Sequence, residues 1–332
     1  MSGGEISHRR TYKQPSRNGS SPQIINKMKD LSNALAVEVD SASEGQRVDN
    51  FLLRLCKGVP RSHIYRILRT GQVRVNSRRV DATYRLQPGD RVRIPPMRLA
   101  RRAEKIAPPL HLPVVYEDDA LLVVDKPAGT AVHGGSGISF GVIEQMRAAK
   151  PQLRFLELVH RLDRETSGLL ILAKKRSALT VLHAALREGR VRKEYLTLVK
   201  GSWRNDKQHV SLPLKKVLTR SGERRVSVDL EGRESQTVFR RKRGIGDYTL
   251  LSAELLTGRT HQIRVHLTHL GFPIAGDDKY GDFELNRRLA KQGLKRMFLH
   301  AGELEFTHPL SGEALKLHAP LPEDLSRFLD SL

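Results

Sequence analysis

The sequence predicts an α+β protein in which a small N-terminal α/β module precedes a larger domain built mainly on an antiparallel sheet. Segments of alternating apolar and polar residues outnumber segments with helical periodicity, and most of them are joined by connections of hairpin length. A stretch rich in proline and charge, at 95–113, separates the two parts as a linker. With 332 residues, the chain is long enough to form a hydrophobic core in each part.

The positive charge of the chain is concentrated in its first third. The whole sequence has 58 Lys and Arg against 36 Asp and Glu, a formal net charge of +22. Residues 1–110 hold 22 of the basic residues and 9 of the acidic ones, an excess of 13. So basic a surface attracts polyanions. The sequence has neither a membrane-spanning apolar segment nor a long basic amphipathic helix, so we expect a nucleic acid rather than a membrane as the partner.

The single cysteine and the N-terminus bear on the cellular compartment. Cys56 excludes an intramolecular disulfide and a zinc site made of paired Cys-x-x-Cys motifs, and its apolar neighbours indicate ordinary helix packing. Residues 1–35 are rich in Ser, Arg, Asn and Gly, so we expect a disordered tail. The tail has no apolar core of the signal-peptide kind. A reducing, cytoplasmic location is therefore expected.

The N-terminal module, at about 46–105, is predicted to begin with two helices. Apolar residues recur at i, i+3, i+4 and i+7 from Val48, which indicates an amphipathic helix that ends near Gly58. A second helix is expected after Pro60, with Ser62 as its N-cap. Each helix would thus turn one apolar face towards a common core.

Two short strands are expected next, at 73–75 and 92–94, where Val and Ile alternate with Arg. Because successive side chains of a strand point to opposite faces, the apolar residues and the arginines cannot share a face. We therefore predict that arginines of the second helix and of these strands gather on one RNA-binding surface; the alternative is a charged face that contacts only solvent. The six arginines are Arg61, Arg66, Arg69, Arg74, Arg91 and Arg93.

The larger domain, at 111–325, is predicted to consist mostly of strands joined by polar turns. A strand–turn–strand pattern ends at Gly129 and is followed by a flexible His-Gly-Gly-Ser-Gly segment. The other elements expected are strands at 156–159 and 169–173, a helix at 177–188, strands at 195–199, 209–214, 226–239 and 248–256, and a short helix from Thr260 to Gly271.

Familiar catalytic motifs are absent from the sequence, which contains no Walker phosphate loop, no Gly-x-Ser-x-Gly and no His-Glu-x-x-His. His261, His266 and His269 lie close together, but only the last two share a helix face, and no carboxylate or cysteine nearby completes a metal site. Helix-surface or RNA-facing histidines are the simpler interpretation. We therefore expect neither a metal nor an organic cofactor.

Asp163 is the carboxylate best placed for chemistry. It lies in the polar turn His160–Gly168 between two apolar strands, and thus at a rigid strand end. A carboxylate flanked by arginines should stay ionised, and such a group suits attack on a sugar carbon or stabilisation of an oxocarbenium-like centre. A second carboxylic acid for glycosidase-type acid–base work is not evident. The alternative is a structural Asp that forms a salt bridge or caps the backbone in a tight turn.

Four segments of the larger domain, with the module before them, form a familiar pattern. They are LVVDKPAGTAVHGG, HRLDRETSGLLILAKK, RKEYLTLVKG and TGRTHQIRVHLTHLGFPIAGDDKYG. In this order they resemble the bacterial "A"-type family of large-subunit ribosomal RNA pseudouridine synthases, and the module resembles an S4 RNA-binding domain. The resemblance covers about residues 45–325. It implies a mixed, mainly antiparallel-sheet catalytic domain that breaks the glycosidic bond of uridine, turns the uracil and joins C5 to C1′.

The resemblance implies roles for five residues. Asp163 aligns with the aspartate that attacks or assists at C1′ or, on another proposed route, removes a C2′ proton. Arg161 matches the arginine that enters the space left by the flipped base, and Tyr195 matches the tyrosine under the uracil ring. Arg264 matches the arginine that pairs with the aspartate, and Ile263 matches the apolar residue on the other face of the base.

The function implied is isomerisation of uridines in large-subunit ribosomal RNA, or in its precursor particles, by a monomeric enzyme. A non-catalytic S4-type RNA-binding protein is one alternative. It explains the charge, but it gives no reason for Asp163, Tyr195 and Arg264 to occur together. A nucleoside glycosidase, which would release the free base, is the other alternative.

Overall fold

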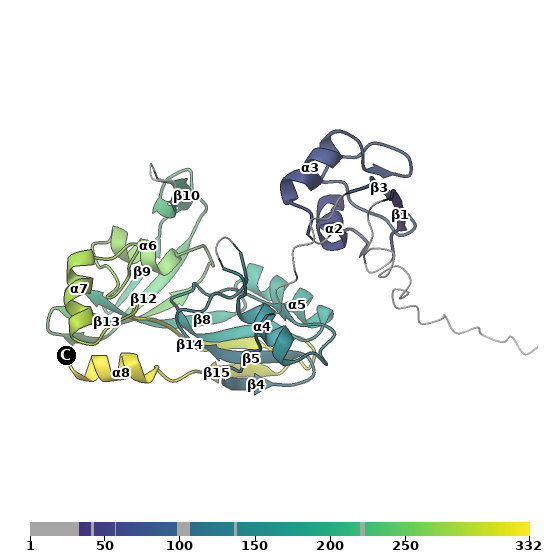
Figure 1. The fold of residues 1–332 in the computed structure, drawn as a ribbon. Helices are drawn as coiled ribbons and strands as arrows, with labels where there is room; N and C mark the ends of the chain where they lie inside the picture. The colour runs from purple at the N-terminus through teal and green to yellow at the C-terminus, as the bar shows by residue number, and fades with distance from the viewer. Residues whose placement is uncertain (1–32, 41–42, 57, 98–106, 136–137, 220–222) are drawn as a thin grey trace, which may run out of the picture. The chain divides into compact units, whose positions relative to one another are not determined.

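The computed structural model describes residues 33–40, 43–56, 58–97, 107–135, 138–219 and 223–332 (Figure 1). The chain divides into two compact units, Met1–Glu104 and Lys105–Leu332, and this boundary falls inside the stretch expected to be a linker. The tail expected at 1–35 lies outside the described residues except for its last three, of which Leu35 begins the first strand.

The first unit contains two helices and a small antiparallel sheet. The helices are α2 (Val48–Leu55) and α3 (Arg61–Arg69). The strands are β1 (Leu35–Glu38), β2 (Arg74–Val75) and β3 (Arg91–Ile94), in the spatial order β1-β3-β2. Apolar residues of all five elements form one core. The amphipathic pattern that predicted the two helices is thereby confirmed, whereas β1 was not predicted.

Two details of this unit bear on the sequence predictions. Cys56 is buried in the core, and burial raises the pKa of its thiol to about 11, so the interpretation as a packing residue is confirmed. The prediction that Ser62 caps the second helix is wrong. Pro60 occupies the N-cap position of α3, so Ser62 already lies inside the first turn, and no side-chain hydrogen bond caps the helix.

The predicted separation of arginines from apolar residues in the short strands is confirmed. Val75, Val92 and Ile94 are buried, whereas the arginines that alternate with them are exposed. The arginines of α3 are exposed as well. All six arginines of the predicted surface, Arg61, Arg66, Arg69, Arg74, Arg91 and Arg93, therefore point towards solvent.

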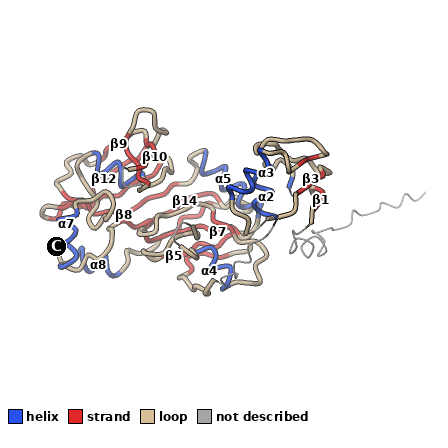
Figure 2. The backbone as a smooth tube through the Cα atoms, turned by 45° about the horizontal axis from the view of Figure 1, so that its top comes forward, coloured by secondary structure: helices blue, strands red, loops and turns tan. Residues whose placement is uncertain are grey.

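The second unit is built on a ten-stranded mixed sheet (Figures 1 and 2). Its strands are β4 (Val114–Glu117), β5 (Leu121–Lys126), β6 (Glu157–Leu158), β7 (Ser167–Ala173), β8 (Arg192–Lys200), β9 (Lys207–Ser211), β12 (Gln236–Ile245), β13 (Tyr248–Leu255), β14 (Leu299–Thr307) and β15 (Ala314–His318). The order is β4-β5-β7-β14-β8-β13-β12-β9, with β6 beside β7 and β15 beside β14. Among these described strands, only β7 and β14 pair in parallel. The predicted α+β class with a mainly antiparallel sheet is confirmed.

Helices cover both faces of this sheet, and a separate hairpin lies beside it. The helices are α4 (Val142–Ala149), α5 (Arg176–Arg187), α6 (Gln262–His269), α7 (Phe283–Lys291) and α8 (Glu323–Asp330), and the hairpin consists of β10 (Leu214–Leu218) and β11 (Arg224–Val228). Alternate residues of β5 and β7 pack against α4 and α6 on one face and against α5 on the other. None of the helices in the described ranges is long and apolar enough to cross a membrane.

Several elements differ from the sequence prediction. The single strand expected at 226–239 is divided into β11 and β12, because the chain turns near Gly232, where a Cβ would lie 2.6 Å from the backbone of Leu214. The strand expected at 209–214 is likewise shared between β9 and β10. The helix expected from Thr260 begins at Gln262. Part of the segment expected to be flexible, 136–137, lies outside the described residues. Helices α4, α7 and α8 and strands β14 and β15 were not predicted.

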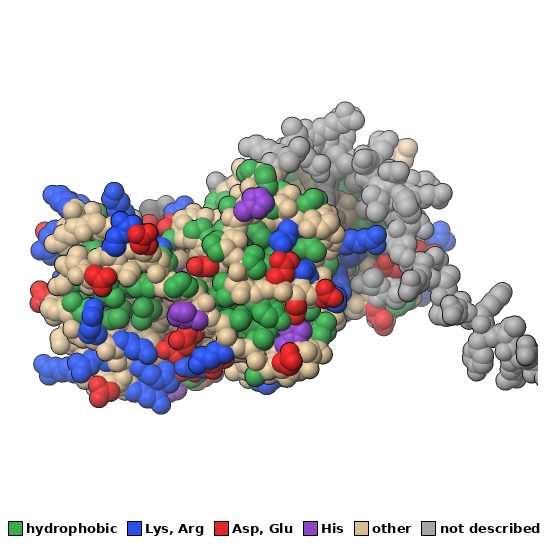
Figure 3. All heavy atoms as spheres, turned by 90° about the horizontal axis from the view of Figure 1, so that it is seen from below, with side chains coloured by type: hydrophobic (Ala, Val, Ile, Leu, Met, Phe, Trp, Pro, Cys, Tyr) green, Lys and Arg blue, Asp and Glu red, His purple; other side chains and the backbone are tan. Residues whose placement is uncertain are grey.

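The outer surface carries both signs of charge. Figure 3 shows one face of the molecule, on which hydrophobic, basic and acidic side chains are interspersed. Ion pairs such as Arg192–Glu305, at 2.9 Å, and Lys316–Glu305, at 3.1 Å, join strands of the large sheet. Such half-exposed pairs contribute little stability individually. The sheet is therefore held mainly by its buried apolar faces.

Candidate active site

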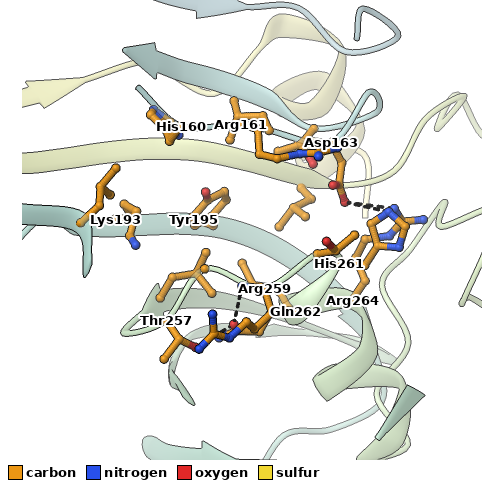
Figure 4. A pocket seen from close by; sticks show the side chains of 18 of the residues that line it. His160, Arg161, Asp163, Lys193, Tyr195, Thr257, Arg259, His261, Gln262 and Arg264 are labelled. Carbon is orange, nitrogen blue, oxygen red and sulfur yellow. Dashed lines mark hydrogen bonds and ion pairs between the residues drawn. The ribbon is translucent and has the colours of Figure 1, made fainter. Parts of the chain in front are cut away.

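A cavity of about 650 Å³ lies beside the central strands of the large sheet (Figure 4). Its walls come from the turn between β6 and β7, from β8, from the segment after β13 and from the first turn of α6. All five residues to which the resemblance gave a role line this cavity: Arg161, Asp163, Tyr195, Ile263 and Arg264. A second cavity, of about 450 Å³, adjoins the first at Asp163 and Arg264. The fold thus brings together residues that are up to about a hundred positions apart.

A buried lysine fixes the turn that carries Asp163. The ammonium group of Lys126, at the end of β5, donates hydrogen bonds to the carbonyl oxygens of Pro127, Thr130 and Arg164 at 2.8, 2.9 and 3.2 Å. The last of these bonds ties the residue after Asp163 to the loop that follows β5. Burial lowers the pKa of Lys126 to about 8. This lysine is the internal anchor of the turn.

Strand β7, which leaves the turn, is also held in place by close contacts. Gly168 of β7 has φ of 111°, and a Cβ there would lie 2.2 Å from the carbonyl oxygen of Ala301 in β14, so only glycine fits. Next to it, the hydroxyl of Ser167 is 2.9 Å from Nδ1 of His300 and accepts a hydrogen bond from Arg296 at 2.6 Å. Asp163 is therefore held between two anchored segments.

Arg264 joins Asp163 to a second carboxylate. Its Nη1 donates to Oδ2 of Asp163 at 3.1 Å, and its Nε and Nη2 donate to the two oxygens of Asp277 at 2.8 and 2.7 Å. Arg264 and Asp277 are buried, whereas 19% of the Asp163 side chain is exposed. Burial opposes the charge of Arg264, but the hydrogen bonds and charge of Asp277, together with Asp163, raise its pKa overall. The arginine stays charged and holds one oxygen of Asp163.

His261 approaches Asp163 from the start of α6, where its backbone is left-handed with φ of 55°. Its Nε2 is 3.8 Å from Oδ2 of Asp163, which is too long for a hydrogen bond. Burial lowers the pKa of His261, although the charge of Asp163 opposes this shift. The hydroxyl of Tyr280 accepts a hydrogen bond from the backbone N–H of Val226 and lies 2.8 Å from Nδ1 of His261. If Tyr280 donates to Nδ1, the remaining imidazole proton is on Nε2 and faces Asp163.

Tyr195 and Ile263 give the cavity an aromatic and an aliphatic wall. Both side chains are buried, the first on β8 and the second in the first turn of α6. Burial, with a further contribution from the charge of Asp163, raises the pKa of Tyr195, so its phenol stays protonated. Both side chains thus border the cavity into which the Asp163 carboxylate opens.

Arg161 lies at the exposed rim of the cavity, two residues before Asp163. Its guanidinium makes no hydrogen bond or ion pair with any residue that the structure describes. The preceding His160 is neutral, because burial lowers its pKa to about 4, and its Nε2 accepts the backbone N–H of Ile171 at 3.1 Å. The hydrogen bond of His160 thus holds this end of the turn in place. The guanidinium N–H groups of Arg161 have no acceptor among the described residues.

Sequence reasoning missed several residues of this site. Asp277 was part of the quoted segment AGDDKYG, yet nothing local distinguished it from Asp278, which is exposed. Tyr280 was missed in the same way. The surface interpretation of His266 is wrong, since the side chain is buried with Nε2 2.9 Å from Ser235 Oγ. In the described part of the chain, no group of three or more His, Cys, Asp or Glu side chains is arranged to hold a metal ion.

Known pseudouridine synthases are similar to this chain over most of its length. Residues 120–269 match the family RNA pseudouridylate synthase, and residues 46–92 match the S4 domain. "Ribosomal large subunit pseudouridine synthase C" of Escherichia coli K12 is 53% identical over 308 residues, covering 90% of this chain and 96% of that protein. The protein of the same name from Yersinia pestis is 51% identical over 304 residues, covering 89% and 95%.

Solved structures share the fold of the larger unit. Human RNA Pseudouridylate Synthase Domain Containing 1 is 28% identical with a TM-score of 0.55, covering 66% of this chain and 87% of that one. Human RNA Pseudouridylate Synthase Domain Containing 4 is 23% identical with the same TM-score, covering 66% and 92%.

Proposed function

The chain belongs to the RNA pseudouridylate synthase family, with an S4 domain before the catalytic domain, and on this premise we propose that it isomerises uridines of large-subunit ribosomal RNA with Asp163 as its catalytic carboxylate. The substrate is inferred from its relatives, which are named for the large ribosomal subunit. What supports Asp163 is one observation: its carboxylate faces a cavity walled by Tyr195 and Ile263 and is held there by Arg264 at 3.1 Å.

One oxygen of the Asp163 carboxylate is free to take part in the reaction. Breaking the bond between C1′ and N1 leaves positive charge at C1′, which a nearby carboxylate either stabilises or captures as a covalent bond. Removal of a C2′ proton is the other route open to it. Only Oδ2 of Asp163 bonds to Arg264, and Oδ1 has no partner among the described residues. Arg264 thus orients the group without occupying both of its oxygens.

The walls of the cavity suit a single flipped uracil. Tyr195 offers a ring face for stacking, and Ile263 covers the opposite side. A base inside a helix is shielded, so it must leave the stack, which costs a few kcal/mol. Stacking on Tyr195 returns roughly 1–3 kcal/mol of this. Arg161, with its guanidinium unpaired at the rim, would fill the gap left in the RNA and offset part of the remainder.

The RNA strand has a path past Asp163. The two cavities share Arg161, Asp163, His261 and Arg264, so nucleotides on either side of the target would occupy one cavity each. The six exposed arginines of the first unit would add sequence-independent contacts to phosphates. We further propose a monomeric enzyme, since the five proposed site residues already meet in one cavity of a single chain. With ribosomal RNA as the substrate, the reaction takes place in the cytoplasm.

The experiment is to map pseudouridines in large-subunit ribosomal RNA from cells with and without this protein. We expect specific sites to lose pseudouridine in its absence and to regain it with the wild type but not with Asp163→Asn. Asp206→Asn, at an exposed position, is the matched control and should restore every site. Unchanged maps would refute the substrate, abasic sites would indicate a glycosidase, and full restoration by Asp163→Asn would refute the catalytic assignment.

A further inference from the structure

Lys193 is a buried cation in the wall of the cavity that has no partner among the described residues. Those residues include three buried cationic side chains, Lys126, Lys193 and Arg264. Lys126 is bonded to three carbonyl oxygens, and Arg264 is paired with two carboxylates. Lys193 is only 8% exposed and lines the cavity, yet it forms no hydrogen bond or ion pair with any described residue. Burying such a charge is costly, so it needs an explanation outside the folding of the chain.

The position of Lys193 relates it to the base. It precedes Tyr195 by two residues on β8, so both side chains leave the same face of the strand, with Cα atoms about 7 Å apart. Figure 4 shows Tyr195 between Lys193 and Asp163. In uracil, N1 carries the sugar and O4 lies on the far edge of the ring. A base stacked on Tyr195 with its C1′ at Asp163 therefore turns that far edge towards Lys193.

Asp163 is the one carboxylate among the residues that line the cavity with Lys193. The lining also contains His160, which is neutral, and the basic side chains of Arg161, Arg187 and Arg259, none of which can pair with an ammonium group. Burial is the sole cause that lowers the pKa of Lys193, with no contribution from a carboxylate. Asp163 is already bonded to Arg264. The ammonium group of Lys193 can therefore interact with an anion that the substrate supplies.

We propose that Lys193 stabilises the negative charge that develops on uracil when the glycosidic bond breaks. This inference rests on the proposed function. The C1′–N1 electron pair leaves with N1, so the base becomes an anion whose charge spreads to O2 and O4, while Asp163 compensates the positive C1′. The C5 carbon of the anion then bonds to C1′, the C5 proton is released and N1 gains a proton. The charge on the base exists only between these two bond changes, and Lys193 acts during that interval.

Such a contact accelerates the chemical step more than it strengthens binding. A fixed charge stabilises a developing anion far more strongly in a site shielded from water than in solution. Removing one such donor typically slows the chemical step by about 10²–10³-fold. A neutral uracil in the ground state interacts with the ammonium more weakly than the anion does. The loss of Lys193 should therefore appear in the rate rather than in RNA affinity.

The test compares single-turnover rates of pseudouridine formation on a ribosomal RNA fragment. We expect Lys193→Met and Lys193→Gln to lose about 10²–10³-fold, and Lys193→Arg to lose less than about tenfold, because it keeps the charge. Lys200→Met is the control on the same strand, outside the cavity, where the lysine pairs with Asp282 at 3.0 Å, and it should stay near the wild-type rate. A Lys193→Met variant within about threefold of wild type would overturn the inference.

A second substrate separates charge stabilisation from a packing role. Fluorine at C5 withdraws electrons and makes the base a better leaving group. With 5-fluorouridine as the target, the measured quantity is the rate at which the N-glycosidic bond is lost. The rate defect of Lys193→Met should be at least about tenfold smaller on this substrate than on uridine. Equal fold-losses on the two substrates would overturn the inference. Lys193→Met should also melt no lower than wild type, because it removes an unpaired buried charge.

Binding measurements complete the test. The Kd for RNA and its salt dependence should be the same for Lys193→Met and wild type. A salt slope reduced by about 0.7–0.9 would mean that Lys193 contacts a phosphate, which would overturn the inference. The outcomes separate this inference from the proposed function. A wild-type enzyme that forms no pseudouridine refutes both the proposed function and the role of Lys193. If the wild type is active, Asp163→Asn is inactive and Lys193→Met is active, only the role of Lys193 is refuted.

Discussion

Arg264 contacts Asp163 through Nη1 alone, at 3.1 Å, and this single bond fixes one oxygen of a carboxylate that otherwise faces the cavity. The geometry is possible because the other donors of the guanidinium are bound by Asp277. A planar fork with five donors can serve two carboxylates at once, which an ammonium cannot do with the same geometry. The buried Arg264–Asp277 pair therefore positions the partly buried carboxylate of Asp163.

Asp277→Asn should destabilise the catalytic unit, because it leaves a buried arginine without its main counter-charge. Breaking a buried ion pair in this way typically costs about 3–5 kcal/mol. Fluorescence of Trp203, the single tryptophan of the chain, reports on the unfolding of this unit in urea. Asp278→Asn is the control: this carboxylate lies 3.9 Å from Arg264 but is 73% exposed, so its loss should leave the unfolding midpoint almost unchanged.

The same variant has a predicted pH dependence. Burial opposes ionisation of Asp277, but Arg264 and two backbone N–H groups lower its pKa overall. Stability from a carboxyl group with a lowered folded pKa is present above its unfolded pKa, about 3.9, and is lost as pH falls through the folded value. The difference in stability between wild type and Asp277→Asn should therefore be full at pH 7 and shrink below about pH 4. A difference that does not change with pH would contradict the pairing.

Lys126→Met should weaken the turn that carries Asp163. Three buried carbonyl oxygens would lose their donor, and each unsatisfied group costs about 1–3 kcal/mol. Burial lowers the pKa of Lys126 to about 8, so its contribution to stability grows as pH rises from about 8 towards the unfolded value near 10.4. We expect the gap in melting temperature between wild type and variant to widen over that range. Lys207→Met, at an exposed lysine of the same unit, is the control and should leave the melting temperature almost unchanged.

Arg161→Ala should slow the reaction most on well-structured RNA. The guanidinium would fill the gap left by the flipped base, and this matters only where the base was stacked. Single-turnover rates on a matched pair of stem-loops, one with the target uridine already bulged, measure the effect. Equal fold-losses on both substrates would leave Arg161 with a positioning role only.

Replacing Arg61, Arg66 and Arg69 by Gln should weaken binding to large RNA and flatten its salt dependence. Each phosphate that the variant no longer neutralises should reduce the log–log slope by about 0.7–0.9. Replacing Arg287, Arg288 and Lys291 of α7 removes the same charge elsewhere and is the control. An unchanged slope in the first variant would indicate that the basic face contacts only solvent.

Local features of the sequence predicted what depends on local structure. The polar turn between two apolar strands located Asp163, because strand periodicity and turn residues are properties of neighbours in the chain. Likewise, alternation was sufficient to place the arginines of the first unit on the exposed face of its strands. The resemblance then selected five residues, all of which line the cavity.

Long-range pairing was beyond the sequence. Asp277 and Asp278 are identical neighbours, and only the packed position of Arg264, 13 residues earlier in the chain, decides which of them is buried. The parallel pairing of β7 with β14 depends on Gly168 meeting Ala301, a contact that no local pattern encodes. Lys193 lay just before the strand expected at 195–199, and nothing local set it apart, because its isolation is a property of the assembled cavity.

The place of β14 in the sheet also has a consequence for biosynthesis. This strand lies between β7, which follows the Asp163 turn, and β8, which carries Tyr195, yet it is synthesised after both of them. Until residues 299–307 emerge, those two strands have no common neighbour and the site has no fixed geometry. Late, non-local closure of this kind makes folding slow. A nascent chain is therefore expected to be catalytically silent until β14 has emerged, and a truncation that removes β14 should disable the site without deleting any of its five proposed residues.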